Sequence, residues 1–242
     1  MMRAMDPGTP DGDSTGSGRV VVQIASGTVS VALAVALFFW AAGRIDWIAG
    51  WVYIGYCTVC HSLSALYLWR RNPDLLRRRG RIGAGTGKWD VVWLAVFGLL
   101  VSTILVVAAL DAGRYQWSST PFWMQWIGAG LYAVFVIVLT WAMAVNPHFE
   151  KTVRIQHDRE HRVIDTGPYR WIRHPGYLAL LLGFVFGPPL LLGSSWALAP
   201  ASLAAVWIVV RTALEDRYLH AGLSGYAEYA QRVRYRLLPR IW

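Results

Sequence analysis

Charged residues are scarce in this chain of 242 residues: they make up 15% of it, whereas about 25% is usual for a soluble domain. Hydrophobic residues reach 55%, and 14 residues are tryptophan. This composition excludes a disordered chain and argues against a water-soluble globule. Cysteine is scarcer still, with two residues, which excludes a disulfide framework.

Long stretches without any charge explain the low charge content. The ranges Val20–Gly43, Trp47–Trp69 and Val91–Leu110 contain 24, 23 and 20 residues and no charged side chain. A helix needs about 20 apolar residues to cross the hydrocarbon core of a bilayer. Each range therefore predicts one transmembrane helix, and the apolar range Phe122–Val145 predicts a fourth.

A longer uncharged range, His174–Val210, exceeds what one crossing needs. Two glycine-rich sites, Gly187-Pro188-Pro189 and Gly193-Ser194-Ser195, are expected to break a helix inside it. We therefore predict a helical hairpin with arms near Gly176–Phe186 and Trp196–Arg211. The fold class that follows is an all-α integral membrane protein with five to six transmembrane helices.

The basic residues predict the orientation. Arg70–Lys88 carries seven basic residues and one acidic residue, and Lys151–Arg173 and the segment from Arg211 onwards carry six basic residues each. The loops Gly43–Asp46 and Asp111–Pro121 carry one basic residue each. With six spans, the three basic segments fall on one side, which the positive-inside rule makes cytoplasmic. The net charge of +9 is then mostly a sign of topology, so no nucleic-acid partner is expected.

Three regions follow from this pattern. Residues 1–19, rich in small and polar residues, are predicted to be a disordered cytoplasmic tail. Residues 20–145 hold the four N-terminal transmembrane helices, the first of which has no cleavage site after it. Residues 146–242 form a catalytic region, with a cytoplasmic loop, the hairpin and a C-terminal tail.

Two motifs with metal-binding spacing carry little weight. Cys57-Thr-Val-Cys60-His61 fits a haem-attachment pattern but lies in the middle of a predicted span. His157-Asp-Arg-Glu160-His161 fits an inverted zinc-protease motif, yet it lies in a charged segment that resembles a loop more than a helix and has no evident third ligand. We expect no metal site.

Chemistry-bearing residues concentrate in Thr152–Tyr177, which precedes the hairpin and is dense in Tyr, Trp, His and Arg. At the end of the hairpin, Arg211 and Glu215 are four residues apart and thus share one face of a helix at the membrane boundary. Such a pair can simply stabilise a helix. Ionisable groups near a bilayer are costly, however, and are functional candidates.

The order Gly167-Pro168-Tyr169, Arg173-His174-Pro175-Gly176-Tyr177, Arg211-x-x-x-Glu215 and Gly225-Tyr226-x-x-Tyr229 resembles the integral-membrane methyltransferases typified by isoprenylcysteine carboxyl methyltransferase, with phospholipid N-methyltransferases as relatives. The resemblance covers residues 146–242. It implies a cytoplasmic pocket for S-adenosylmethionine, closed by the C-terminal tail. The cofactor-contacting residues it implies are Gln156, His161, Arg162, Val163, Ile164, Tyr169, His174, Pro175, Gly176, Tyr177 and Glu215, and the residue that contacts the substrate is Arg211. The acidic run is limited to Glu215-Asp216, shorter than in eukaryotic members.

These residue types suit methyl transfer, which needs alignment and exclusion of water more than acid–base groups. Arg211 could hold an acceptor carboxylate, and Glu215 could balance the cationic cofactor. We therefore expect carboxyl O-methylation of an isoprenylcysteine-like lipophilic acceptor that arrives from the membrane lipids, in a bacterial cell membrane. The alternatives are a lipid amine N-methyltransferase, an NADPH-dependent sterol-type reductase with a similar pattern, and an inactive membrane scaffold.

Overall fold

The computed structural model describes residues 14–73, 88–150 and 162–242, and every regular element in these ranges is a helix, as predicted. The long helices are α1 (Ser14–Ala42), α2 (Ile48–Arg71), α4 (Lys88–Ala108), α5 (Phe122–Val145) and α8 (Leu198–Gly222). The shorter elements are η1 (Ala109–Tyr115), which prolongs α4, and η3 (Gly167–Arg170), α6 (Pro175–Ala179), η4 (Leu180–Val185), α7 (Gly187–Leu192) and α9 (Tyr226–Arg232).

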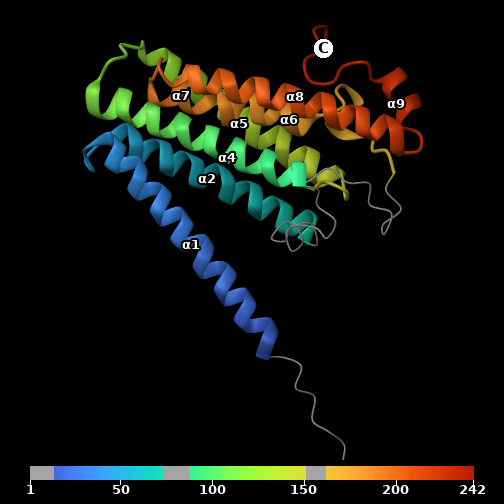
Figure 1. Cartoon of the computed structure of the whole chain (residues 1–242), viewed down its shortest axis with the longest axis horizontal. Coiled ribbons are helices and arrows are strands. Elements are labelled where there is room, and N and C mark those ends of the chain that lie inside the picture. The colour runs from blue at the N-terminus through green and yellow to red at the C-terminus, as the bar shows by residue number, and fades with distance from the viewer. Residues whose placement is uncertain (1–13, 74–87, 151–161) are drawn as a thin grey trace, which may run out of the picture.

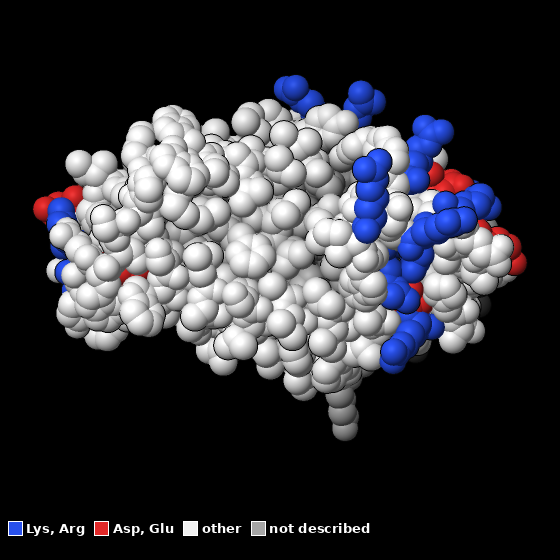
Figure 2. Space-filling model, turned by 90° about the horizontal axis from the view of Figure 1, so that it is seen from above, with Lys and Arg blue, Asp and Glu red and all other residues white. Residues whose placement is uncertain are grey.

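Four helical segments in the described ranges are long and apolar enough to cross a membrane: Trp89–Tyr115, Phe122–Val145, Pro175–Leu192 and Leu198–Gly222. Figure 2 shows a broad uncharged surface between two ends that carry charge. Large hydrophobic side chains of the spanning helices are exposed, among them Trp126, Ile137 and Val206, and soluble proteins rarely expose so many. The chain is a multi-pass membrane protein. Because α2 and the shorter apolar helix Gly27–Ala42 lie outside this set, the total of five to six crossings stays a prediction.

The first arm of the hairpin is longer than predicted. It runs from Pro175 through α6, η4 and α7 to Leu192, with one bend at Phe186. The predicted break at Gly187-Pro188-Pro189 takes the form of this bend, because η4 ends at Val185 and α7 begins at Gly187 with both prolines in its first turn, where their missing N–H groups cost no hydrogen bond. Contrary to the prediction, the arm does not end there but continues through α7. The arm ends at the second predicted break, at Gly193, whose φ of 74° lies in the left-handed region that glycine adopts readily.

The spanning helices pack through close backbone contacts. In Figure 1, α2, α4, α5, α7 and α8 run side by side, and α5 contacts α2, α6, η4 and α7. Gly128 of α5 lies so close to the backbone of Leu190 and Leu191 that a Cβ atom would collide with it, and Gly183 lies equally close to Phe135. Small residues at membrane helix interfaces permit such approach. The tight α5–α7 contact fixes the frame on which the C-terminal region rests.

Helix α1 leaves this bundle at an angle (Figure 1). Its last residues, among them Phe38 and Phe39, are buried where α1 meets η1 and α4, whereas side chains such as Val31 and Leu33 are exposed. Because α1 begins at Ser14, it includes the last residues of the segment 1–19 that was predicted to be disordered.

Basic side chains gather at one end of the bundle, the end that carries α9 (Figure 2). Two of the basic segments meet there, because Arg173 pairs with Asp216 of α8, and the pair of Arg211 with Asp90 joins the third segment to the start of α4, which follows the first basic segment. The shared side that the topology predicted is thus seen in the fold. We call this the basic end, and the opposite end, with η1 and Gly193, the outer end.

Candidate active site

A cavity of about 260 Å³ lies at the basic end, where α4, α5, α6, α8 and α9 meet. One side of it is apolar and is lined by side chains of the spanning helices, including Trp93, Phe97, Leu139 and Leu180. At 1.5 Å per residue, Phe97 lies about 14 Å along α4 from its first residue. The cavity therefore extends from the basic end into the apolar part of the bundle.

The other side of the cavity is polar and contains most of the residues predicted to contact a cofactor. Those that line it are Arg162, Val163, Ile164, Tyr169, His174, Pro175, Gly176, Tyr177 and Glu215. Gln156 and His161 lie outside the described residues. Arg211 is placed behind the wall of the cavity, not in its lining. The fold thus brings the predicted set together, with Arg211 set back from it.

Tyr169 is held in the wall by a glycine turn and two hydrogen bonds. Gly167, with a φ of 59°, starts the 3-10 turn that carries Tyr169. Asn146 Nδ2 donates to the Tyr169 hydroxyl at 3.0 Å, and the Tyr229 hydroxyl donates to the Tyr169 carbonyl at 2.7 Å. Burial, and secondarily the charge of Glu215, raises the pKa of Tyr169 well above its ordinary value, so its hydroxyl stays protonated.

His174-Pro175-Gly176 brings the chain from the polar side into α6. Pro175 occupies the first turn of this helix, where its fixed φ is favourable. Gly176 faces Phe149 so closely that a Cβ atom would lie 2.9 Å from the end of that ring. This close approach places Tyr177, one residue later, against the cavity.

Glu215 presents a carboxylate to the cavity and is tied to Tyr177. The Tyr177 hydroxyl donates to Glu215 Oε2 at 2.5 Å, and His174 Nδ1 lies 4.0 Å from Glu215 Oε1. The Glu215 side chain is 22% exposed, so it is reachable by a small molecule in the cavity. An anionic group beside two tyrosine rings is an arrangement that favours a cation.

Asp216, the next residue, fastens the C-terminal tail to α8. Arg173 donates to both of its carboxylate oxygens, at 2.8 and 3.0 Å, and Tyr226 and Arg236 donate to it at 2.9 and 2.8 Å. His174 Nε2 lies 3.1 Å from the same carboxylate. The side chain is 1% exposed. The sequence motifs included Asp216 but gave no sign that it, not Glu215, joins the motif Arg173-His174 to the tail.

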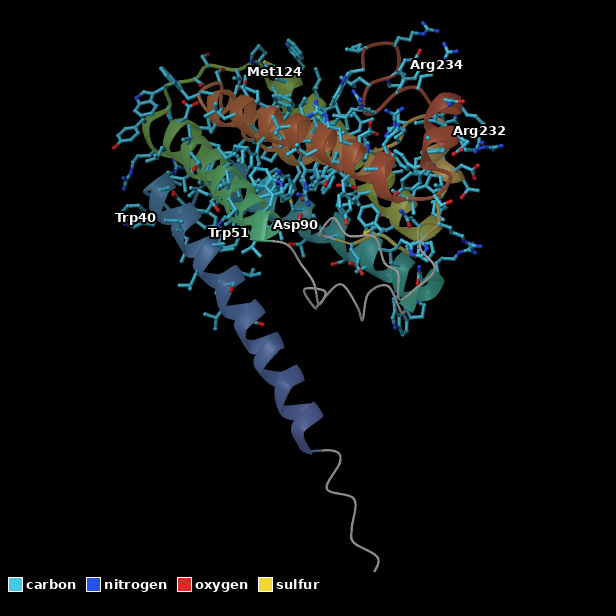
Figure 3. All side chains as sticks on the ribbon, turned by 45° about the vertical axis from the view of Figure 1, so that its right-hand side comes forward. Trp40, Trp51, Asp90, Met124, Arg232 and Arg234 are labelled. Carbon is cyan, nitrogen blue, oxygen red and sulfur yellow. The ribbon has the colours of Figure 1, made fainter. Side chains whose placement is uncertain are left out.

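Arg211 forms an ion pair that the sequence did not predict. Its Nη2 donates to Oδ1 of Asp90, which lies at the N-terminal end of α4 (Figure 3), and its Nε donates to the Tyr177 hydroxyl at 3.2 Å. Its guanidinium carbon lies 5.1 Å from the centre of the Trp93 ring. The predicted link between Arg211 and Glu215 therefore runs through Tyr177. The sequence contained one sign of this ion pair: Arg211 lies inside a span, where a buried cation needs an anionic partner.

Comparison with protein families finds a match in this region. Residues 126–221 match the model of the isoprenylcysteine carboxyl methyltransferase (ICMT) family. The predicted family resemblance is confirmed. The matched region runs from α5 through most of α8 and thus contains Tyr169, His174, Tyr177 and Glu215, whereas Asp90 and α9 lie outside it.

The chain is also similar to a protein whose name refers to metal resistance. It is 29% identical over 143 residues to the nickel-cobalt-cadmium resistance protein NccN of Alcaligenes xylosoxydans xylosoxydans. The alignment covers 57% of this chain and 61% of NccN, so less than two thirds of the relative is spanned. Within the described part of this chain, no group of three or more His, Cys, Asp or Glu side chains could hold a metal ion.

Proposed function

We propose that this protein is an S-adenosylmethionine-dependent methyltransferase that acts in the membrane on a lipophilic acceptor. The observation that carries the proposal is the two-sided cavity, with a polar side built from the family motifs and an apolar side built from the spanning helices. A water-soluble cofactor suits the first side, and the chain of a lipid suits the second. The ICMT family match supports the methyltransferase class.

The residues of the polar side fit this cofactor. Its sulfonium and amino groups are cationic, and the cavity offers the Glu215 carboxylate together with the rings of Tyr169 and Tyr177. When bound, S-adenosylmethionine would supply an activated methyl group, whose bond to sulfur breaks as the acceptor atom binds the carbon. Tyr177 orients Glu215 through the 2.5 Å hydrogen bond, and the buried His174 and Pro175 help to keep water out.

The proposal also covers the methyl acceptor and the side of the membrane on which the site lies. The family points to a carboxyl group on an isoprenylcysteine-like lipid, with Arg211 as the contact that the sequence predicts. Because Arg211 is paired with Asp90, the structure gives more support to the alternative acceptor, a lipid amine. The excess of basic residues beside the cavity supports a cytoplasmic site in a bacterial cell membrane.

Binding of the cofactor tests the class of enzyme. Calorimetry of the detergent-purified protein should detect S-adenosylmethionine and not NADPH. His174→Ala and Tyr169→Ala should each weaken that binding by about 1–3 kcal/mol, roughly five- to 150-fold, because each removes a ring or a polar contact at the cavity. Tyr115→Ala is the matched control, because Tyr115 is exposed at the outer end.

The opposite result would move the assignment to another class. Binding of NADPH without S-adenosylmethionine would favour the sterol-type reductase, and binding of neither would favour an inactive scaffold. Labelling of the Arg70–Lys88 loop from outside intact cells would contradict the cytoplasmic site.

A further inference from the structure

The pair of Asp90 and Arg211 lies directly behind the cavity wall. The two residues are 4% and 2% exposed. Trp93 and Tyr177 both contact the Arg211 guanidinium, and they line the cavity whereas Arg211 does not. Among the described residues, no buried side-chain nitrogen or oxygen lacks a hydrogen-bond partner. The buried donors of Arg211 are therefore satisfied by the chain itself, before any acceptor arrives.

This arrangement opposes a carboxylate acceptor at Arg211. An entering carboxylate would have to displace Asp90 from the guanidinium or be buried beside it. Displacement takes the Arg211 guanidinium away from a buried carboxylate, and sharing places two anions at one guanidinium. Either outcome lowers affinity for an acid relative to an uncharged analogue, so Asp90 acts as a repulsive element as well as a partner.

We propose that Asp90 is a specificity-determining residue, which occupies Arg211 with a carboxylate of the chain itself, so that the cavity takes a lipophilic acceptor without a carboxylate, such as a lipid amine. This inference rests on the proposed methyltransferase function and selects among its acceptors. Asp90 acts through Arg211 and does not line the cavity, so it is a positioning residue.

A pair of matched probes measures this effect. The first is N-acetyl-S-farnesylcysteine, which carries a carboxylate, and the second is its primary amide, which has the same farnesyl chain and no charge. Because Asp90 repels a second carboxylate, we expect the wild-type protein to bind the amide at least about threefold more tightly than the acid. In Asp90→Asn the guanidinium is released, and the acid should bind at least tenfold more tightly than the amide, because guanidinium and carboxylate form a bidentate pair.

Two further variants separate specificity from stability. Asp90→Glu keeps a carboxylate and should keep the acid-to-amide ratio of the wild type. The double variant Asp90→Asn/Arg211→Gln removes the guanidinium and should lose the preference for the acid that Asp90→Asn gains. A purely structural role of Asp90 would change the affinities for both probes alike and leave their ratio unchanged.

A wild-type protein that binds the acid as tightly as the amide, or more tightly, would overturn the proposal, and this comparison holds even if Asp90→Asn does not fold. Equal behaviour of the two probes in a folded Asp90→Asn protein, including failure of both to bind, would also overturn it. Calorimetry with S-adenosylmethionine on the same preparations tests the enzyme class separately. Loss of cofactor binding in the wild type would refute the proposed function, whatever the acid-to-amide ratio.

Discussion

The two ends of α4 and its extension η1 each contain a buried aspartate, and the two are satisfied by different chemistry. At the outer end, Asp111 accepts hydrogen bonds from the Ser118 amide and hydroxyl at 2.8 and 2.6 Å, from the Ser194 hydroxyl at 2.6 Å and from the Trp196 amide at 3.3 Å. At the basic end, Asp90 pairs with the guanidinium of Arg211. Neutral donors hold the first carboxylate, and a cation holds the second.

This difference corresponds to what each end does. Asp111 joins the loop before α5 to the turn before α8 and is 0% exposed, so it serves the fold alone. At the basic end, Asp90, Arg211, Glu215, Asp216 and Arg173 form ion pairs and hydrogen bonds around a cavity. Charged groups are costly to bury and are kept where their charge acts on a ligand or fixes a geometry. Substitutions at the two ends should therefore separate stability from ligand binding.

The largest effect is expected for Asp216→Ala. This change leaves the buried guanidinium of Arg173 without a carboxylate and releases Tyr226 and Arg236 of the tail, so the free energy of unfolding should fall by about 3–5 kcal/mol. Affinity for S-adenosylmethionine should fall with it, because Arg173 and His174 line the cavity. Thermal unfolding in detergent and calorimetry measure the two quantities.

Asp165→Ala is the matched control for Asp216→Ala. The ion pair of Asp165 with Arg232 is exposed on both sides, at 53% and 62%, and such pairs contribute at most about 1 kcal/mol. Equal losses of stability in the two variants would show that the Asp216 network does not hold the tail.

The next effect belongs to the outer end. Asp111→Ala leaves the Ser118 and Ser194 donors without their acceptor and should lower the free energy of unfolding by about 3 kcal/mol. The affinity of the folded protein for S-adenosylmethionine should stay at the wild-type value, because the cavity lies at the other end of α4. Asp46→Ala, which removes an exposed ion pair with Arg44, is the control. A parallel loss of cofactor affinity in Asp111→Ala would mean that the two ends are coupled.

A smaller effect, confined to the ligand, is expected for Glu215→Gln. The substitution keeps the shape of the side chain and removes the charge that faces a cationic cofactor. Because Glu215 is partly exposed, we take the lower part of the range for charged hydrogen bonds, about 1.5 kcal/mol or roughly tenfold in dissociation constant. Thermal stability should change little. Glu228→Gln on the exposed side of α9 should leave both quantities unchanged, and unchanged cofactor binding in Glu215→Gln would remove Glu215 from the proposed site.

Much of the fold could be predicted because the bilayer imposes a length on each apolar run. The predicted span Phe122–Val145 coincides with α5. The first arm of the hairpin was predicted too short, since Gly-Pro-Pro signals a break in a helix but not whether the chain turns back there or starts a new helix in the same arm. The turn comes at the left-handed Gly193, which two serines follow, whereas the two prolines after Gly187 lie in the first turn of α7.

The candidate site also contains residues that could be predicted and one that could not. Tyr169, His174, Tyr177 and Glu215 were predicted through the resemblance to a methyltransferase family, and the fold brings all four to one cavity. Asp90 could not be predicted, because it comes from a helix far away in the sequence, where it marked only the edge of an uncharged run. Two residues on distant spans can pair at any separation in the sequence, so a single sequence does not reveal which ones do.

The last prediction compares the two ends at alkaline pH, where the thermal stability should depend on the buried tyrosines of the basic end; at neutral pH this effect is absent. Burial raises the pKa of Tyr226 well above its ordinary value of 10.0, and the neighbouring Asp216 raises it further. Burial likewise raises the pKa of Tyr169 and of Tyr229. Above pH 10 the unfolded chain releases these protons while the folded chain keeps them, so the stabilisation is complete below pH 10 and is lost as the pH rises further. The unfolding temperature should therefore be constant from pH 7 to about 9.5 and decline above that range.

The variant Tyr226→Phe should be less stable than the wild type at pH 8, because it loses the hydrogen bond to Asp216. Its unfolding temperature should nevertheless decline less steeply above pH 10, because one of the three phenols is gone. Tyr115→Phe, at the exposed outer end, should keep the wild-type slope. An identical slope in all three proteins would show that the buried tyrosines of the basic end do not set the alkaline limit.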